Sequence, residues 1–226
     1  MTATQVSAEE LFRAAYENRY TWDPDFPGYS AEVTYWDGER TFVGQVRVGA
    51  DLKATVTGVE DEEARKAIHN QLWEIAIHRV RRSFAETHGN NTFRYGQILP
   101  DGSVEILVGG KAEGDRYHVR DNQVTMVHRH IHGVVVTIHT FSSHDTGEGY
   151  LSHRYDSVYH DAKTGEQKGG RSQFEDLYTK VGKYYILSER RIQTETEAGV
   201  VEKCFSFSNF ALLDASGQAT TKSPTP

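Results

Sequence analysis

Residues 123–141, QVTMVHRHIHGVVVTIHTF, indicate the class of fold. Two runs rich in β-branched residues, Gln123–Ile131 and Val134–Phe141, are separated by the pair His132-Gly133. Runs of this length and composition, bounded by a glycine-containing pair, predict two strands joined by a tight turn. The stretch therefore predicts antiparallel sheet, and its four histidines make it the first place to look for chemistry.

Further strand candidates lie on both sides of this hairpin and are separated by turn signals such as Asp37-Gly38 and Pro100-Asp101-Gly102. Aspartate-glycine pairs are strong hairpin signals. Many short strands with regular turns predict one large antiparallel sheet, which must curl, split or close. The other predicted strands are Ala31–Trp36, Thr41–Val48, Leu52–Val56, Thr92–Ile98, Ser103–Gly109, Arg116–Arg120, Leu151–His160, Gln173–Val181, Tyr184–Glu195 and Val201–Leu212.

Two helices are predicted before most of these strands. Ser7 and Glu10 have the spacing of a capping box, which starts a helix that we expect to end near Asn18. A longer helix is predicted over Asp61–Ala85, because Ile68, Leu72, Ile75, Val80 and Phe84 form an apolar stripe at helical spacing. This stripe predicts that the longer helix covers one face of the sheet.

The predicted fold class is therefore α+β, with a large curved antiparallel sheet that forms a half-barrel or partial barrel. The N-terminal helix and the longer helix pack on it, and a closed barrel with a ligand cavity is the alternative. A chain of 226 residues with 37% hydrophobic and 25% charged residues suits one folded domain. We expect that domain to span residues 1–213, and the small, polar residues 214–226 to form a disordered tail.

Charge and composition exclude several classes of partner. A net charge of −7 and a pI near 5.9 argue against binding to nucleic acid, which needs a basic patch. The single cysteine, Cys204, predicts a reducing compartment, and residues 1–10 lack the features of a secretory signal. No run approaches the roughly 18 apolar residues of a membrane span. We therefore expect a cytoplasmic protein without a transmembrane segment, free in solution or in peripheral contact with a membrane.

The histidines of the opening stretch are candidate metal ligands. His128, His130 and His132 lie on one face if the strand is regular, and His139 can join them from the next strand. Neutral imidazoles are ligands for zinc or another divalent metal. The competing interpretation is a solvent-facing row in which His132-Gly133 is simply the turn. No resident cofactor is expected under that interpretation.

A second cluster of polar residues follows within residues 143–156, SHDTGEGYLSHRYD. It contains His144, Asp145, Glu148, His153 and Asp156, and a histidine beside a carboxylate can transfer protons. Glycines around Glu148 favour a flexible polar loop instead. No serine elbow or phosphate-binding loop accompanies it, so catalysis is not the favoured interpretation.

Aromatic residues are abundant, at 11% of the chain, and crowd residues 20–36. Apolar ligand sites are lined mainly by such side chains with a few placed polar groups. The alternative is that they form ordinary cross-strand pairs in the sheet. The candidate ligand-binding residues are Tyr20, Trp22, Phe26, Tyr29, Trp36 and Trp73.

Four segments resemble a cyanobacterial and chloroplast family known as a domain of unknown function. They are EELFRAAYENRYTWDPDFPGYSAEVT (residues 9–34), VEILVGG (104–110), DTGEGYLSHRYDSVY (145–159) and FSFSNFALL (205–213). The resemblance implies an oxygenic phototroph as the source and assigns no catalytic residue. A looser, architectural similarity is to the lipoprotein-carrier half-barrel, which shelters acyl chains, although the long helix is additional.

These observations favour a non-catalytic role. We expect a carrier or assembly factor that binds a lipophilic ligand (a lipid, quinone or pigment) or a partner protein near photosynthetic membranes. A metal-dependent enzyme that uses His128, His130 and His132 is the alternative, and a pure protein-interaction module is a third hypothesis. A carrier requires an apolar site between sheet and helices, whereas an enzyme requires convergent ligands.

Overall fold

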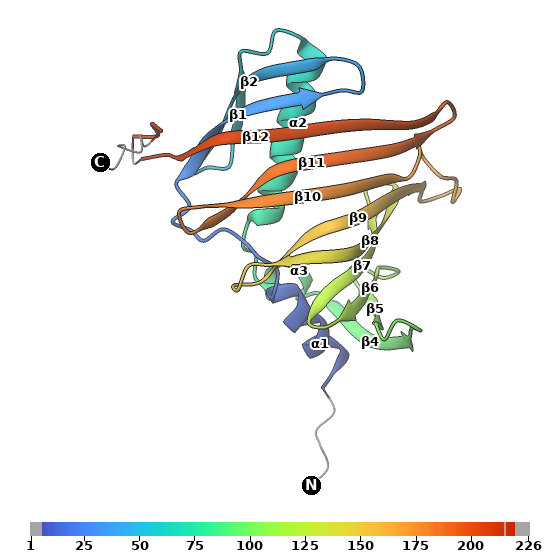
Figure 1. Ribbon diagram of the computed structural model, residues 1–226. Coiled ribbons are helices and arrows are strands. Elements are labelled where there is room, and N and C mark those ends of the chain that lie inside the picture. The colour runs from blue at the N-terminus through green and yellow to red at the C-terminus, as the bar shows by residue number, and fades with distance from the viewer. Residues whose placement is uncertain (1–5, 215, 220–226) are drawn as a thin grey trace. The chain divides into compact units, whose positions relative to one another are not determined.

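Three helices and twelve strands lie along residues 6–214 and 216–219, which are the residues that the computed structural model describes (Figure 1). The elements in chain order are α1 (Ala8–Glu17), β1 (Gly28–Trp36), β2 (Thr41–Gly49), β3 (Ala54–Thr57), α2 (Glu62–Arg79), α3 (Phe84–His88), β4 (Asn91–Ile98), β5 (Val104–Gly110), β6 (Arg116–Arg120), β7 (Gln123–Ile131), β8 (Val134–Asp145), β9 (Tyr150–Asp161), β10 (Ser172–Val181), β11 (Tyr184–Thr196) and β12 (Gly199–Leu212).

The strands follow the order β3-β2-β1-β12-β11-β10-β9-β8-β7-β6-β5-β4 in one sheet. From β4 to β12 each strand lies beside its neighbour in sequence, as expected for strands joined by short turns. The predicted α+β class with a large antiparallel sheet is confirmed. The order is linear, with β3 and β4 at its ends, and this favours the predicted half-barrel over a closed barrel.

The chain divides into two compact units, which are described separately. Unit 1 contains described residues 6–20, 82–174 and 194–200, and unit 2 contains residues 21–81, 175–193, 201–214 and 216–219. The expectation of one domain over residues 1–213 stays a prediction. Of the predicted tail, residues 215 and 220–226 lie outside the described residues, while Asp214 accepts hydrogen bonds from the backbone N–H groups of Ser216 and Gln218 in a turn.

Helix α1 starts where the sequence predicts. The Ser7 hydroxyl accepts a hydrogen bond from the Glu10 backbone N–H at 3.1 Å, and the Glu10 carboxylate accepts one from the Ser7 N–H at 2.8 Å. This capping box satisfies backbone donors that have no partner in the first turn. In unit 1, α1 contacts α3 and strands β4, β6 and β7 (Figure 1).

Phe12 lies at the centre of the unit 1 core and is 1% exposed. Its ring stacks on Tyr117 of β6 with centroids 4.3 Å apart, and it contacts Phe84 and His88 at 5.7 and 5.1 Å. Ile106 of β5 is fully buried in the same cluster. Helix α1 is therefore held mainly by aromatic packing against one face of the sheet.

Burial of His88 in this cluster makes the stability of unit 1 sensitive to acid. Burial lowers the pKa of His88 to about 4, and the positive charges of Arg129 and Arg19 act in the same direction. In the unfolded chain the pKa is about 6.5. Between these values the unfolded chain binds a proton that the folded chain does not. Stability is therefore complete above pH 6.5 and falls, by at most about 3 kcal/mol, as the pH drops toward 4.

The measurement is urea denaturation of the wild type and His88→Gln at pH 7 and pH 4.5. The wild type should lose more stability than the variant over this interval, because other titrating groups are common to both proteins. An equal loss in the two proteins would contradict the role of His88.

In unit 2, β1 pairs with both β2 and β12, and its side chains alternate between faces. Val33 is fully buried and pairs with Gly44 and Phe207, while Tyr35 stacks on Phe205 with ring centroids 4.4 Å apart. Helix α2 covers this unit with a buried stripe on one side and contacts β3. The buried members of the stripe are Ala64, Ile68, Leu72, Ile75 and Ala76.

The longer helix ends earlier than predicted. The sequence predicts Asp61–Ala85, but α2 ends at Arg79 and Val80 is extended, with ψ at 126°. The Arg79 carbonyl accepts a hydrogen bond from the Trp22 N–H at 2.9 Å, so the backbone leaves the helix to pair with another segment of unit 2. A second capping box, between Ser83 and Glu86, then starts the short helix α3. No helix in the described part of the chain is long and apolar enough to cross a membrane.

Candidate functional site

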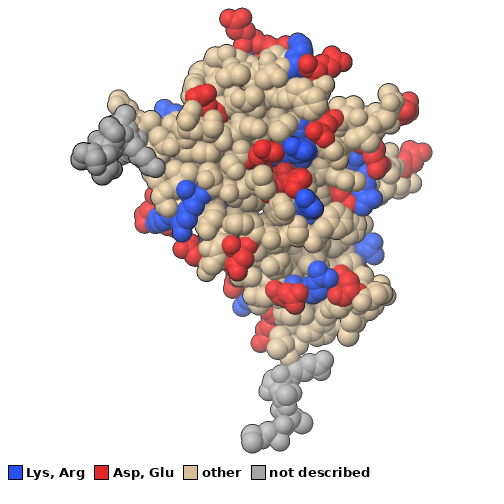
Figure 2. Space-filling model, viewed as in Figure 1, with Lys and Arg blue, Asp and Glu red and all other residues tan. Residues whose placement is uncertain are grey.

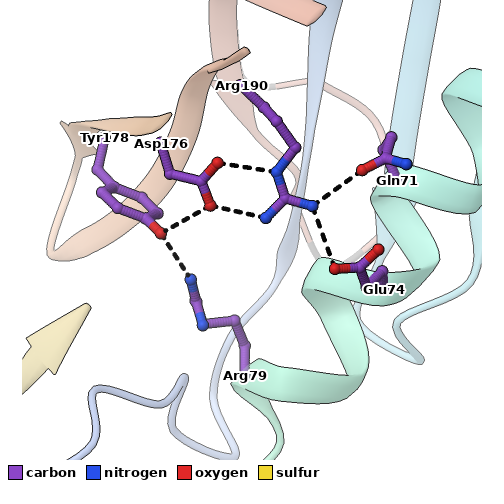
Figure 3. Close-up of polar contacts among 6 residues, drawn as sticks. All are labelled: Gln71, Glu74, Arg79, Asp176, Tyr178 and Arg190. Atoms are coloured by element: carbon purple, nitrogen blue, oxygen red, sulfur yellow. Dashed lines mark hydrogen bonds and ion pairs between the residues drawn. The ribbon is translucent and has the colours of Figure 1, made fainter. Parts of the chain in front are cut away.

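A buried ion pair lies on the helix-facing side of the sheet in unit 2 (Figure 3). Arg190 of β11 donates from Nε to Asp176 Oδ1 at 2.8 Å and from Nη2 to Asp176 Oδ2 at 2.6 Å. The side chains of Arg190 and Asp176 are 5% and 2% exposed. This two-bond geometry is the strongest form of guanidinium–carboxylate contact.

Helix α2 binds the other edge of the same guanidinium. Arg190 Nη1 donates to Gln71 Oε1 at 2.9 Å and to Glu74 Oε1 at 3.3 Å. Gln71 and Glu74 are three residues apart and therefore lie on one side of α2. The guanidinium thus connects the helix with β10 and β11, beside the apolar stripe.

A tyrosine and a second arginine extend this cluster. Tyr178 donates its hydroxyl hydrogen to Asp176 Oδ2 at 3.3 Å, and Arg79 Nη2 donates to the Tyr178 hydroxyl oxygen at 3.4 Å. The Arg79 guanidinium also lies 5.6 Å from the centroid of the Tyr178 ring. Burial, reinforced by the nearby Asp176 carboxylate, raises the pKa of Tyr178 well above its usual range. Tyr178 is therefore a neutral hydrogen-bond donor at physiological pH.

The sequence did not identify this cluster, because its residues are spread over residues 71–190. One feature of the sequence could have indicated the cluster, and it is the position of Arg190 on β11. Tyr184 and Ile186 are buried, and Arg190 continues their alternation on the same face. A charged residue at a predicted inward position needs a buried partner, so such a residue is a marker for a polar site.

The predicted aromatic ligand residues do not form one group. Tyr20 belongs to unit 1 and the other five belong to unit 2. Trp22 and Phe26 stack with ring centroids 3.9 Å apart, and Tyr29 meets both rings edge-on. These three side chains are at most 4% exposed, so they fill space for one another as core residues.

The two remaining aromatic candidates are accessible. Trp73 on α2 is 55% exposed and follows the buried Leu72, so it lies away from the buried stripe. Trp36 is half-buried at the end of β1, where it pairs with Thr41 and Cys204. Trp73 is therefore the most exposed of the six aromatic candidates.

The predicted row of three histidines is not formed, because His132 lies in the turn. Strand β7 ends at Ile131 and β8 begins at Val134, and His132 and Gly133 have φ angles of 48° and 84°. Two positive φ angles are typical of the type I′ turn that best joins twisted antiparallel strands. His132 therefore cannot continue the alternation of His128 and His130.

The other three predicted metal ligands have separate partners in unit 1. His128 Nδ1 lies 2.8 Å from the Thr137 hydroxyl, His130 Nδ1 donates to Asp115 at 3.1 Å, and His139 Nδ1 donates to Asp156 at 3.2 Å. Among residues 6–214 and 216–219, no group of three or more His, Cys, Asp or Glu side chains is placed to hold a metal ion.

Asp156 of the second predicted cluster pairs with residues outside that cluster. Its side chain is 1% exposed and accepts hydrogen bonds from His139 and from Arg171 Nε, the latter at 2.7 Å. His153, by contrast, has its Nδ1 3.1 Å from the Ser142 hydroxyl, and Asp145 accepts from the Gly147 N–H in the loop after β8. Among these contacts, His153 and Asp156 therefore have different partners.

Surface charge gives no further site on the face that is drawn. Figure 2 shows acidic and basic side chains interspersed over this face. The exposed ion pairs of the described residues include the contacts of Arg40 with Asp37 and Asp61, each at 3.1 Å. Such pairs contribute little to stability and mark no binding surface by themselves.

Comparisons with known proteins place the chain in a family. A family model described as "Protein of unknown function (DUF3386)" matches residues 3–213. No curated protein sequence matches the chain. One similar solved structure is that of a LolA superfamily protein from Nitrosomonas europaea, which is 9% identical, with a TM-score of 0.37 and coverage of 93% of this chain and 95% of the other. The predicted resemblance to a domain-of-unknown-function family is confirmed, while a cyanobacterial source stays a prediction. The chain belongs to the DUF3386 family of proteins of unknown function.

Proposed function

We propose that this protein is a non-catalytic carrier or assembly factor that binds a lipophilic ligand in unit 2. A lipid, quinone or pigment fits this proposal, and a partner protein near photosynthetic membranes is the alternative occupant. The association with photosynthetic membranes rests on the sequence resemblance alone. A cytoplasmic location, with peripheral contact to a membrane, is part of the same proposal.

The observation that carries the proposal is the buried Arg190–Asp176 pair within an apolar surface. The helix-facing side of the sheet is lined by buried side chains such as Val33, Tyr35 and Phe207, and the ion pair lies on the same side, against α2. Lipophilic-ligand sites combine a mostly apolar lining with a few placed polar groups. A purely structural core does not need a charge at this position, because apolar residues of similar volume are at least as stabilising.

Among the six predicted aromatic residues, the proposal gives different roles to different side chains. Trp73 is exposed and is proposed to contact the ligand directly. Trp22, Phe26 and Tyr29 are packed on one another and are proposed to form the rigid part of unit 2 that supports the site. Tyr20 and Trp36 stay candidates without a contact that favours them.

Native mass spectrometry of the untagged protein, purified from its own organism, tests the proposal. We expect an added mass that matches a lipid, quinone or pigment and that disappears after extraction with organic solvent. Trp73→Ala should retain less of this mass than the wild type, and Phe141→Ala, at an exposed aromatic position of unit 1, provides the matched control.

Two outcomes would count against the carrier. A mass increment of one divalent metal that is lost in His130→Ala would favour the metal-dependent enzyme. A protein without any added mass, from cells in which the ligand pool is intact, would favour the interaction module.

A further inference from the structure

The two edges of the Arg190 guanidinium contact partners that differ in exposure. Nε and Nη2 bind Asp176, whose side chain is 2% exposed, whereas Nη1 binds Gln71 and Glu74 of α2. The Glu74 side chain is 41% exposed, and its contact of 3.3 Å is the longest of these four. An anion that arrives from solvent therefore replaces Glu74 more easily than it replaces Asp176.

The charges of this cluster are balanced only while Glu74 stays in contact with Arg190. Arg79 donates to the neutral hydroxyl of Tyr178, so the cluster in Figure 3 contains two guanidiniums and two carboxylates. Only one of the carboxylates, that of Asp176, is buried. If Glu74 turned toward solvent, these side chains would carry one more positive than negative charge, in surroundings where burial strengthens electrostatic attraction.

We infer that the lipophilic ligand of the proposed function carries a carboxylate head group, which binds the Nη1 edge of Arg190 in place of the Glu74 carboxylate. The planar guanidinium matches a carboxylate in geometry and stays charged at all physiological pH values. Trp73 directly precedes Glu74 on α2, about 100° around the helix from it, and is 55% exposed, so an alkyl chain that leaves the head group toward solvent can reach its ring. In the ligand-free protein, Glu74 occupies the position of the head group.

The test compares oleate with oleyl alcohol, which share one alkyl chain and differ in the head group. Binding to the full chain is measured by isothermal titration calorimetry, after lipid has been removed by extraction and refolding has been verified by circular dichroism. The wild type should bind oleate more tightly than oleyl alcohol. Glu74→Gln should bind oleate about tenfold more tightly than the wild type does, because the competing charge is removed. Its affinity for oleyl alcohol should equal that of the wild type.

Two further variants make the test specific. Glu63→Gln removes a charge from an exposed position on the same helix and should change neither affinity. Arg79→Gln removes the second cation and should weaken oleate several-fold without affecting oleyl alcohol. Arg190 itself is left unchanged, since its replacement is expected to destabilise the fold.

The outcomes separate this inference from the proposed function. The carboxylate inference is overturned if the wild type binds oleate and oleyl alcohol with equal affinity. It is also overturned if Glu74→Gln changes both affinities by the same factor. In either case the protein remains a binder of lipophilic molecules. If neither probe binds to the wild type or to any variant, the proposed function is contradicted and the inference falls with it.

Discussion

Replacing Arg190 by methionine is expected to lower the free energy of unfolding by about 3–5 kcal/mol. The methionine fills much of the arginine volume but leaves the Asp176 carboxylate, 2% exposed, without its two guanidinium hydrogen bonds. A charge buried without its counter-ion is far more costly than the pair is stabilising. The expected loss is a large part of the total stability of a domain of ordinary size.

The measurement is urea denaturation followed by tryptophan fluorescence at pH 7. The control is the double variant Arg190→Met, Asp176→Leu, in which both charges are removed. It should recover most of the stability lost in Arg190→Met, since apolar residues can replace a buried pair at little cost. If the single and double variants are equally unstable, the loss comes from packing, and the electrostatic explanation is wrong.

Replacing Phe12 by alanine is expected to cost about 3–5 kcal/mol. Phe12 is 1% exposed and its ring contacts five aromatic side chains of unit 1, of which Tyr117 is the nearest at 4.3 Å. Truncation leaves a cavity among large rings that cannot collapse without moving α1. The loss of packing contacts then adds to the loss of buried apolar area.

Urea denaturation also measures this effect, with two comparisons. Phe12→Leu keeps most of the volume and should cost about 1 kcal/mol. Trp73→Ala, at an exposed position, should change stability by less than about 0.5 kcal/mol. A cost below about 1 kcal/mol for Phe12→Ala would mean that α1 is not required for the core of unit 1.

The local features of the fold could be predicted from the sequence because their causes are local. The capping box of Ser7 and Glu10 and the hairpin at Asp37-Gly38 each depend on a few neighbouring residues, and each is confirmed. Strand β1 begins at Gly28 rather than the predicted Ala31, because Gly28 pairs with Gly49 of β2. Side-chain alternation also predicts which face of β1 is buried.

The misplaced end of the longer helix has a long-range cause. The helical stripe continues past Arg79, but α2 ends there and its last carbonyl accepts a hydrogen bond from Trp22, which lies far away in the sequence. The local pattern is compatible with two structures, and a partner elsewhere in the chain decides between them. At His132-Gly133, by contrast, the cause is local, because the pair forms the turn that the sequence also predicts.

Long-range contacts are also the reason why the candidate site could not be predicted. Arg190 and Asp176 lie on successive strands, but Gln71 and Glu74 reach them from a helix more distant in the sequence. Composition showed that aromatic residues are abundant without showing which are exposed. Trp22 and Phe26 stack on each other in the core, whereas Trp73 lies in solvent.

The pairing of β1 with β12 sets a problem for the nascent chain. From β5 onward each strand can pair with the strand synthesised just before it. Val33 of β1, however, cannot pair with Phe207 of β12 until almost the whole chain has been synthesised. While the ribosome makes the intervening residues, β1 is paired with β2 on one side and has an open edge on the other. Open strand edges are where other chains attach and aggregation begins. Slow translation prolongs this exposure, so we expect the yield of folded protein to depend on chaperones that hold β1–β3 until β12 has left the ribosome.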